Sequence, residues 1–466
     1  MTTMLAQRLC DFIDASPTAF HATDSIATDL ESRGARFLDE RSDWKLEPGA
    51  LYFTRRAGSS LIAFRPGLEP PAAAGFAVAG AHTDSPGLKA RLGKSLSGKG
   101  LERVPVEVYG NPIISTWMDR PLSLAGRVVL RSPGSSAASY AGTVNRTETR
   151  LVKLARPIGV IPNLAIHLNR EINKGFEYNA QGQLPVLVAA LPTIGLTPSE
   201  TDGVKAGGSE TSWLHRLISR ELGVDPGAIL GADLFFVDAQ KVCLMGTEEE
   251  LVNGYRLDDL LGCHAVLEGF LASEAGSHTQ VACFLDNEEV GSRTAQGADS
   301  AFLRDVLSRI NALSVSPSFS YTLSESETEN FYRALASSFN ISVDVAQAFH
   351  PSYAEKFDEG FAPVLNGGPA IKANANFKYA TDAASEAAFR LLCEESGVTY
   401  QKFMSRADMV PGSTIGPMSA SLTGILTVDI GHPLLSMHSA RETAGVRDHE
   451  GMVAVLARHF TRGPRR

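Results

Sequence analysis

Apolar and polar positions follow two regular patterns along much of the chain. Apolar runs typical of buried strands occur at 75–81 (GFAVAGA), 278–286 (HTQVACFLD), 339–349 (FNISVDVAQAF) and 424–431 (GILTVDIG). Helical periodicity occurs at 18–34 (TAFHATDSIATDLESRG), 258–273 (DDLLGCHAVLEGFLAS), 382–396 (DAASEAAFRLLCEES) and 447–460 (RDHEGMVAVLARHF). Because strand and helix units alternate, the pattern predicts an α/β fold with a mixed, mostly parallel sheet flanked by helices.

The first of these helices carries start and stop signals. Ser16 and Pro17 come just before the apolar periodicity, and Gly34 comes just after it. Serine is a favoured N-cap, proline fits the first helical turn, and glycine commonly follows a helix end. We therefore expect a helix that Ser16 caps and Gly34 ends.

Residues 91–235 have a different pattern, which is richer in alternating and β-branched runs. Examples are VPVEVYG (104–110), LAGRVVLRS (124–132), TRLVKLA (149–155) and IGVIPNLAIHL (158–168). We predict an inserted β-rich domain over 91–235, between two parts of the α/β domain at 1–90 and 236–466. The alternating setting of His167 in the last of these runs predicts that it lies on a strand.

The composition is that of a soluble globular protein. The chain has 466 residues, of which 44% are hydrophobic, so it can bury a large core in two or three lobes. Charged residues make up 20% of the chain, and the net charge of -9 comes from acidic and basic residues that are mixed throughout. This pattern indicates no nucleic-acid partner. No apolar stretch reaches the roughly 18 residues that a membrane span requires, so we expect no membrane insertion.

Cysteine usage and the first residues favour the cytoplasm. The cysteines are odd in number, far apart and never in a C-x-x-C pair: Cys10, Cys243, Cys263, Cys283 and Cys393. Most lie in apolar runs, so we expect buried free thiols and a reducing compartment. The first 20 residues lack the basic start and small-residue cleavage site of a secretory signal.

Histidines and carboxylates follow four of the predicted strands. They are His82 and Asp84 after 75–81, Glu288 and Glu289 after VACFLD, Asp344 after FNISV, and His438 beyond ILTVDI; Asp258 starts the helix at 258–273. Functional groups in open α/β sheets gather beyond the carboxyl ends of the strands. Two histidines and three carboxylates are enough for two metal ions if one carboxylate bridges them and a water completes both coordination shells.

Two further carboxylates have roles in such a site. The adjacent Glu288 and Glu289 can divide the work of general base and metal ligand. Asp84 can accept the remaining ring N–H of His82 and thereby fix the tautomer of that ligand. Taken alone, each residue has an ordinary explanation: a turn pair, a solvated acidic face, a helix N-cap for Asp258, or a loop histidine for His438. Their coincidence at strand ends favours the metal site.

Long motifs in these segments resemble the M18 family of metallopeptidases, the aspartyl aminopeptidases and their vacuolar relatives, over nearly the whole chain. The motifs are AHTDSPGLK (81–89), LDNEEVGSRTAQGA (285–298), ADMVPGSTIGPMSA (407–420) and MHSARE (437–442), with ISTWMDRPLSLAGRV (114–128) and IPNLAIHLNREIN (161–173) in the insert. The resemblance implies a fold of the di-zinc exopeptidase type with an inserted dimerisation domain. It also implies a homo-oligomer built from dimers, as in the tetrahedral dodecamers of the family.

The resemblance divides the candidate ligands between two zinc ions per subunit. It implies that His82 and Asp344 hold one ion, that Glu289 and His438 hold the other, and that Asp258 bridges them. Cobalt or manganese would also suit imidazole and carboxylate ligands.

The resemblance also assigns the groups around the ligands. It implies that Glu288 is the general base and that Asp84 orients His82. Related di-zinc enzymes often have a cis peptide bond after the bridging aspartate, so we expect one between Asp258 and Asp259.

Five residues are similar to substrate-contacting positions of the family. Lys372 and Tyr379, in IKANANFKYA (371–380), match residues that contact an acidic P1 side chain, and a lysine ammonium suits a carboxylate. His350 in FHPSY is expected near the pocket, while Gln347 stands where some relatives carry histidine. His167 matches a histidine that reaches a neighbouring subunit's active site.

These features together predict an aminopeptidase that removes an N-terminal residue, preferably Asp or Glu, from peptides by metal-activated water. The loop at 406–417 departs from the family at Ala407, Val410 and Pro411, so a neutral, Leu-type preference is the first alternative. A di-metal carboxypeptidase or N-acyl amino acid deacylase is a second alternative. A non-catalytic oligomeric scaffold is a third, although a scaffold would need none of the predicted ligands.

Overall fold

The computed structural model describes residues 4–132, 146–190, 212–314 and 326–464. The chain forms two compact units, of which the first comprises Met1–Ser85 and Val242–Arg466 and the second comprises Pro86–Lys241. The second unit therefore contains the whole of the predicted insert at 91–235.

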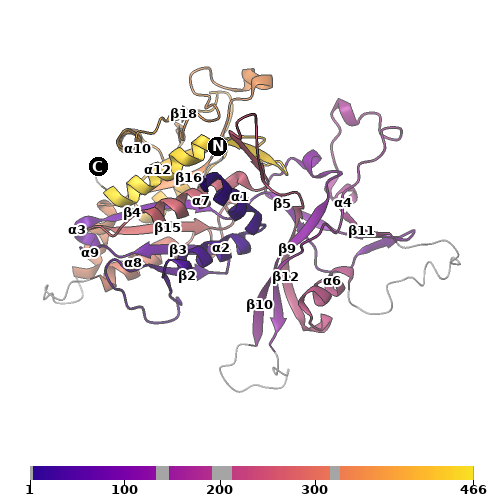
Figure 1. The fold of residues 1–466 in the computed structure, drawn as a ribbon, viewed down its shortest axis with the longest axis horizontal. Helices are drawn as coiled ribbons and strands as arrows, with labels where there is room; N and C mark the ends of the chain where they lie inside the picture. Colours follow the sequence, from indigo (N-terminus) through magenta and orange to yellow (C-terminus); the bar gives the residue numbers. More distant parts are fainter. Residues whose placement is uncertain (1–3, 133–145, 191–211, 315–325, 465–466) are drawn as a thin grey trace. The chain divides into compact units, whose positions relative to one another are not determined.

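A mixed twelve-stranded sheet forms the centre of the first unit (Figure 1). Its four central strands are parallel: β15 (Thr279–Leu285), β4 (Phe76–His82), β16 (Phe339–Gln347) and β19 (Leu426–Leu435). The flanking strands are β1 (Arg36–Phe37), β2 (Tyr52–Arg56), β3 (Ser60–Arg65), β13 (Cys243–Met245), β14 (Leu251–Gly254), β17 (Ala370–Lys372), β18 (Gln401–Phe403) and β20 (Glu442–Gly445). Both β3 and β20 pair antiparallel with this central group. The predicted mixed sheet is thus confirmed, and its parallel strands form the middle.

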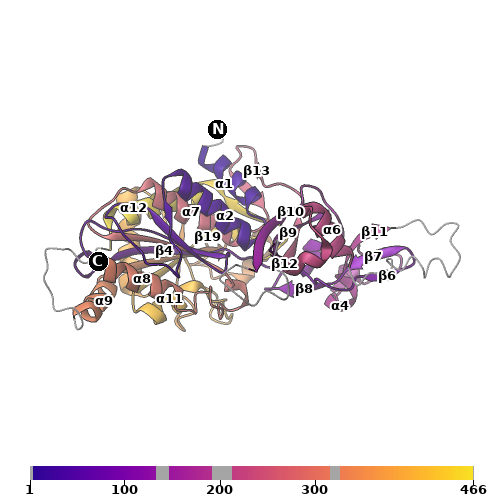
Figure 2. The same cartoon turned by 90° about the horizontal axis from the view of Figure 1, so that it is seen from below.

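Helices cover both faces of this sheet because successive residues of each strand point to opposite sides. In β4, Ala77, Ala79 and Ala81 belong to one core with α1 (Met4–Ala15), α2 (Ala19–Ser32), α7 (Leu257–Ala272), α10 (Ala383–Ser396) and α12 (Val446–Arg462). Phe76 and Val78 belong to the other core, under α8 (Phe302–Leu313), α9 (Ser326–Ala336) and α11 (Ile415–Thr423). Figure 2 shows α7 and α12 on one side of β4 and α8, α9 and α11 on the other.

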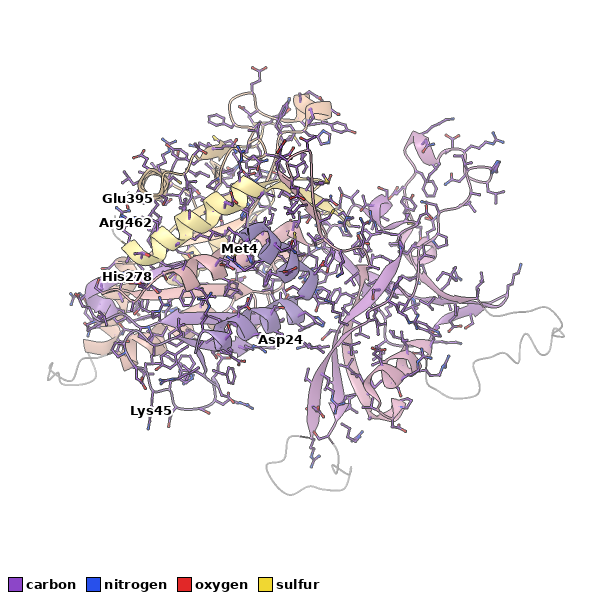
Figure 3. All side chains as sticks on the ribbon, viewed as in Figure 1. Met4, Asp24, Lys45, His278, Glu395 and Arg462 are labelled. Carbon is purple, nitrogen blue, oxygen red and sulfur yellow. The ribbon has the colours of Figure 1, made fainter. Side chains whose placement is uncertain are left out.

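The predicted helices at 18–34, 258–273, 382–396 and 447–460 are confirmed as α2, α7, α10 and α12. Apolar residues of α10 and α12 lie in the same core, and Glu395 and Arg462 form a surface ion pair of 3.3 Å between the two helices (Figure 3). A short helix, α3 (Pro71–Ala74), precedes β4.

The expected cap of α2 is wrong by two residues. The N-cap is Thr18, whose φ of -144° and ψ of 167° are those of extended chain. Ser16 lies outside α2: its backbone N–H donates to the carbonyl oxygen of Ile13 at the end of α1, and its hydroxyl donates to Oγ of Ser25. Gly34, with φ of +83°, follows the helix end as expected.

The second unit consists mainly of antiparallel strands. One sheet has the order β10-β9-β12-β5-β8 and another the order β11-β7-β6. Their strands are β5 (Gly87–Ala90), β6 (Leu96–Gly98), β7 (Leu101–Val104), β8 (Val106–Tyr109), β9 (Leu122–Arg131), β10 (Thr147–Lys153), β11 (Val186–Ala190) and β12 (Ile229–Asp238). This unit also contains the helices α4 (Ala180–Gln183) and α6 (Trp213–Leu222) and the 3-10 helices Ile114–Trp117, Ile172–Lys174 and Pro226–Ala228.

The expectation that His167 lies on a strand is wrong. The backbone makes isolated β-bridges at Gly159 and Val160, and His167 lies beyond them in an exposed turn. Pro162 has no N–H to continue a ladder, which accounts for the end of strand pairing there. The turn is closed by the N–H of Leu168, which donates to the carbonyl oxygen of Ala165 at 2.8 Å.

The cysteines are all free thiols. Four are buried, as expected from their apolar settings, whereas Cys243 at the start of β13 is exposed. Across the described ranges, the helices are either too short or too polar to pass through a lipid bilayer.

Candidate metal centre

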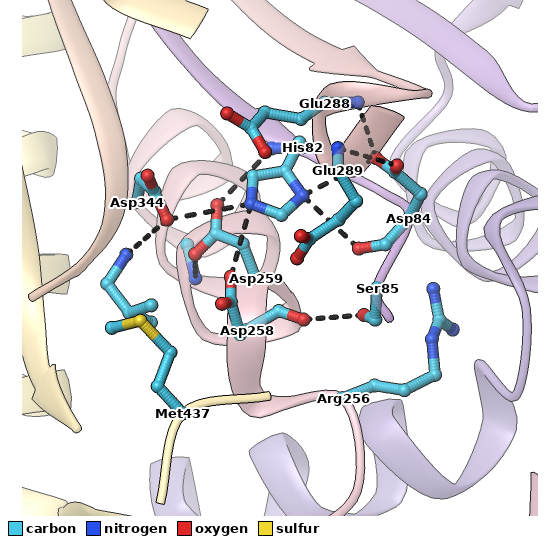
Figure 4. Close-up of polar contacts among 12 residues, drawn as sticks. His82, Asp84, Ser85, Arg256, Asp258, Asp259, Glu288, Glu289, Asp344 and Met437 are labelled. Atoms are coloured by element: carbon cyan, nitrogen blue, oxygen red, sulfur yellow. Dashed lines mark hydrogen bonds and ion pairs between the residues drawn. The ribbon is translucent and has the colours of Figure 1, made fainter. Parts of the chain in front are cut away.

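The parallel strands and the segments that follow them bring the five candidate ligands together. Figure 4 shows His82, Asp258, Glu289 and Asp344 in this cluster. His82 is the last residue of β4, Asp344 lies within β16, Glu289 belongs to the 3-10 helix Glu288–Val290 after β15, His438 lies between β19 and β20, and Asp258 lies in the first turn of α7. Asp344 does not close its strand as expected, because β16 continues to Gln347.

Asp258 lies between the two histidines. Its Oδ1 is 3.2 Å from Nε2 of His82, and its Oδ2 is 3.4 Å from Nε2 of His438. Nε2 of His82 is also 3.5 Å from Oδ1 of Asp344, and Nε2 of His438 is 3.5 Å from Oε2 of Glu289. The side chains therefore form two groups of three potential ligands that share Asp258, and the ligand atoms within each group lie within 4.8 Å of one another.

Two buried oxygens of this cluster indicate that it suits cations. Among the residues that the structure describes, Oδ1 of Asp258 and Oε1 of Glu289 accept no hydrogen bond. A buried acceptor without a donor costs about 1–3 kcal/mol. Imidazole nitrogens and carboxylate oxygens are common zinc ligands, so the atoms present fit divalent metal ions of this kind.

The environment of His82 favours Nε2 as its metal-binding atom. Its Nδ1 lies 3.2 Å from the carbonyl oxygen of Asp84 and 3.5 Å from Oδ1 of the same residue. A proton on Nδ1 would be stabilised by these oxygens, leaving the lone pair of Nε2 for a ligand. Burial lowers the pKa of His82, but its contacts with Asp258, Asp344 and Asp84 raise the pKa well above its ordinary value.

Buried carboxylates other than the candidate ligands hold the backbone of the site. Asp84 accepts hydrogen bonds from the N–H groups of Glu288 at 3.0 Å and Glu289 at 3.1 Å. Asp259 accepts one from the N–H of His82 at 3.2 Å, and the peptide bond that precedes Asp259 is cis, as expected. Asp84 thus connects β4 with the segment after β15.

Sequence reasoning missed the role of Asp259 and that of Glu442, which accepts N–H groups of two candidate ligands. Asp259 is in LDDLLG and Glu442 is the last residue of MHSARE, so both stood inside motifs already considered. Nothing in the spacing of a motif indicates which carboxylate will accept a distant backbone N–H, because that contact depends on the tertiary fold.

Glu288 is a further carboxylate of the site, beside the candidate ligands. It is partly buried, and its carboxylate can lie within 4.8 Å of ligand atoms of His82 and Glu289. Burial and the neighbouring carboxylates raise the pKa of Glu288 to about 8. A group of this kind can hold a proton near neutral pH.

Lys372 is buried beside Asp344. Its Nζ donates to Oδ2 of Asp344 at 3.0 Å and to the carbonyl oxygen of Val345 at 2.8 Å. The ammonium also lies 4.9 Å from the centre of the Tyr379 ring. Burial raises the pKa of the Asp344 carboxyl, but the Lys372 and His82 charges outweigh it and hold that pKa well below its usual range.

Of the other predicted substrate contacts, Gln347 and His350 belong to the first unit and His167 to the second. Gln347 is exposed at the end of β16, and its Nε2 lies 3.9 Å from Sδ of Met437. His350 is partly buried, and its Nδ1 accepts a hydrogen bond from the N–H of Ser352 at 3.2 Å. His167 belongs to the second unit.

Three other histidines form a buried chain in the first unit. Nδ1 of His264 lies 2.9 Å from Nε2 of His449, whose Nδ1 lies 3.4 Å from Nε2 of His432. Nε2 of His264 is 3.5 Å from Oε1 of Glu268. His264 was expected to be a core residue, and it is buried; the chain as a whole was not predicted.

Histidines and carboxylates gathered around parallel strand ends of an α/β sheet are typical of metal-dependent hydrolases. Residues 12–460 match the family described as aminopeptidase I zinc metalloprotease (M18). The chain belongs to this M18 family of aminopeptidases.

Relatives and solved structures match the chain over almost its whole length. "Probable M18 family aminopeptidase 2" of Pseudomonas aeruginosa UCBPP-PA14 is 43% identical over 460 residues, which are 99% of each chain. The protein of the same name from Clostridium acetobutylicum is 43% identical over 445 residues, which are 95% of each chain.

Among solved structures, the Ape4 and Nbr1 complex matches with a TM-score of 0.88 at 35% identity, over 98% of this chain and 85% of that chain. The S. cerevisiae mApe1 dodecamer matches with a TM-score of 0.80 at 27% identity, over 98% and 96%. These likenesses confirm the predicted fold class.

Proposed function

We propose that this M18 aminopeptidase uses two zinc ions per subunit to remove the N-terminal residue of peptides, with a preference for Asp or Glu. The observation that carries the proposal is the position of Asp258, whose two carboxylate oxygens face different histidines. A carboxylate in this position can serve two ions at once.

The geometry supports a division of the ligands. His82 and Asp344 would hold one ion, Glu289 and His438 the other, and Asp258 both. Zinc is the metal named in the family description, and cobalt or manganese would be accepted by the same ligand types. The buried oxygens of Asp258 and Glu289 that lack hydrogen-bond donors among the described residues support this assignment.

The protein groups around the ions would move protons and hold geometry. When bound, the ions supply Lewis acidity that acidifies a water molecule and polarises the scissile carbonyl. Glu288 would take a proton from the attacking water and deliver it to the nitrogen of the leaving amine. Asp84 would hold the backbone of Glu288 and Glu289 next to His82. Its carboxylate accepts the N–H groups of Glu288 and Glu289 and also lies beside the His82 ring.

Lys372 and Tyr379 would select an acidic P1 side chain. An ammonium has three N–H donors, and the contacts with Asp344 and Val345 use two. The third would be directed at the substrate carboxylate, with Gln347 and His350 at the rim.

A neutral P1 preference is the second candidate. It is favoured by the ion pair between Lys372 and Asp344, which already balances the ammonium charge. In that case Lys372 would act on Asp344 alone.

The proposal includes an oligomeric state, which is argued from the second unit, and a cellular location, which is argued from the free cysteines. We propose that the second unit forms dimers, and that His167 reaches the active site of a neighbouring copy. The flanking side chains Leu164, Ile166 and Leu168 are exposed by 56%, 46% and 76%, which supports a covering partner. A dodecamer built from such dimers would agree with the mApe1 assembly.

The free cysteines support a cytoplasmic location.

The proposal is tested by assaying Asp, Glu and Leu chromogenic substrates with and without a chelator. Chelation should abolish activity and added zinc should restore it, and the acidic substrates should be cleaved fastest. Activity that a chelator leaves intact would overturn the metal mechanism. A strong preference for Leu would overturn only the acidic specificity.

A further inference from the structure

Glu442 is a buried carboxylate that contacts two of the candidate ligands through their backbone. It is the first residue of β20 and is 1% exposed. Its Oε2 accepts a hydrogen bond from the N–H of Asp258 at 3.0 Å, and its Oε1 accepts one from the N–H of His438 at 2.7 Å. One side chain therefore connects the residue that faces both histidines with one of those histidines.

The backbone of Glu442 is itself held in place. It pairs with Gly254 of β14, and β20 also pairs with β19. Its carbonyl oxygen accepts a hydrogen bond from Nδ2 of Asn253 at 3.0 Å. Glu442 thus offers a fixed pair of acceptors at the point where α7 and the β19–β20 loop meet.

The two segments that Glu442 contacts are poorly held by regular structure. His438 has φ of +68°, and Ser436 in the same loop has φ of +59°. Side chains other than glycine adopt this left-handed region at a cost, so such a loop persists where its surroundings hold it. Asp258 lies in the first turn of α7 with ψ of 103°, and first-turn N–H groups have no helical acceptor.

Other ligand-bearing segments have partners of their own. Asp84 accepts the N–H groups of Glu288 and Glu289, and Lys372 binds the side chain of Asp344. Glu442 has the corresponding place for Asp258 and His438, which belong with Glu289 to one candidate metal group.

We propose that Glu442 is a positioning residue that holds Asp258 and His438 where both can bind one metal ion, and so sets the affinity of that ion. This inference rests on the proposed di-metal function. It differs from general support of the fold in acting on one ion more than on the other. One ion would lose the support of two ligands, Asp258 and His438, whereas the ion held by His82 and Asp344 would lose only that of the shared Asp258.

Glu442→Gln tests the inference, with Asp448→Asn as a matched control. Asp448 is also fully buried and accepts two backbone N–H groups, of Asn366 and Gly368, both at 2.7 Å. Each amide variant replaces one acceptor oxygen by a donor that faces an N–H group, so both should lower the thermal midpoint. Zinc affinities of the two sites are measured by competition with a chromogenic chelator, beside kcat and KM.

We expect Glu442→Gln to weaken one of the two zinc ions by about 10–100-fold, the usual effect of losing a group that orients a ligand. The other ion, which keeps His82 and Asp344 and shares only Asp258, should be weakened less. kcat should fall at limiting zinc and recover at high zinc with little change in KM. Asp448→Asn should bind both ions like the wild type. If Glu442→Gln proves insoluble, Glu442→Asp, which keeps the charge but is shorter, takes its place.

Equal zinc affinities in the Glu442 and Asp448 variants would overturn the inference, as would equal weakening of both ions. The wild-type titration decides the proposed function separately: one ion or none per chain would contradict the di-metal site itself. The two failures are therefore distinguishable within one experiment.

Discussion

Nζ of Lys372 lies 3.0 Å from Oδ2 of Asp344, and both side chains are buried. The other oxygen of Asp344, Oδ1, faces His82 at 3.5 Å. The lysine therefore neutralises and orients a carboxylate that we assign to a metal ion, whatever it does for the substrate.

Replacing Lys372 by Met separates these two roles. Loss of one partner of a buried ion pair typically costs about 3–5 kcal/mol, so Asp344 should be misplaced and zinc bound less tightly. We expect kcat/KM to fall by about tenfold or more on every substrate, in line with the loss of a ligand-orienting group. An additional loss confined to Asp and Glu substrates would show contact with the P1 carboxylate. An unchanged kcat/KM on Leu substrate would contradict the orienting role.

Glu288→Gln removes the proposed proton carrier while keeping the size of the side chain. Because general bases contribute about 10²–10⁴-fold, kcat should fall within that range. Zinc content should stay at the wild-type value, since Glu288 is not assigned to an ion. Steady-state kinetics with metal analysis of the same sample checks both points, and a variant with wild-type kcat would exclude Glu288 as the base.

The buried histidine chain predicts loss of stability in acid. Burial lowers the pKa of His264 to about 3 and lowers those of His432 and His449 well below their ordinary value. Unfolding frees these rings to bind protons below a pH of about 6.5, whereas the folded rings stay neutral. Their contribution to stability is therefore full above that pH and declines as the pH falls toward 3.

Urea unfolding of wild type and of His449→Gln at pH 7.5, 6 and 5 measures this effect. The free energy of unfolding of the wild type should fall more steeply with decreasing pH than that of the variant. Parallel curves would refute the assignment of the acid sensitivity to these histidines.

Removal of metal should lower the thermal midpoint. Anything that binds only the folded state stabilises it, by about 2.7 kcal/mol at a free concentration of 100 times its Kd. We expect a lower midpoint after chelation and recovery on adding zinc. A midpoint that does not respond to chelator and zinc would mean that the buried oxygens of Asp258 and Glu289 bind no cation.

Much of the fold was predictable because the local patterns and the tertiary structure agree. The apolar strand at β4 and the periodic helix at α7 follow directly from residue order, and their ends place His82 and Asp258. Two predictions from short local patterns were wrong because the neighbouring chain forms a turn instead. Ser16 belongs to the turn that ends α1, where its N–H donates to the carbonyl oxygen of Ile13, and the run around His167 ends as a turn after Pro162.

The candidate site, like the fold, was predictable from the sequence only in part. Residue types at strand ends were enough to nominate the ligands, whereas Asp259 and Glu442 act through backbone N–H groups that lie far away in sequence. The pairing of β14 with β20 brings Glu442 to Asp258, and no spacing rule within MHSARE contains that pairing.

The number of zinc ions per chain, by mass spectrometry of purified wild-type and Asp258→Ala proteins, tests the central claim most directly. The shared position of Asp258 predicts two ions in the wild type and fewer than one in the variant, because both ions lose a ligand. A wild type with one ion or none, or an Asp258→Ala protein that keeps two, would contradict it.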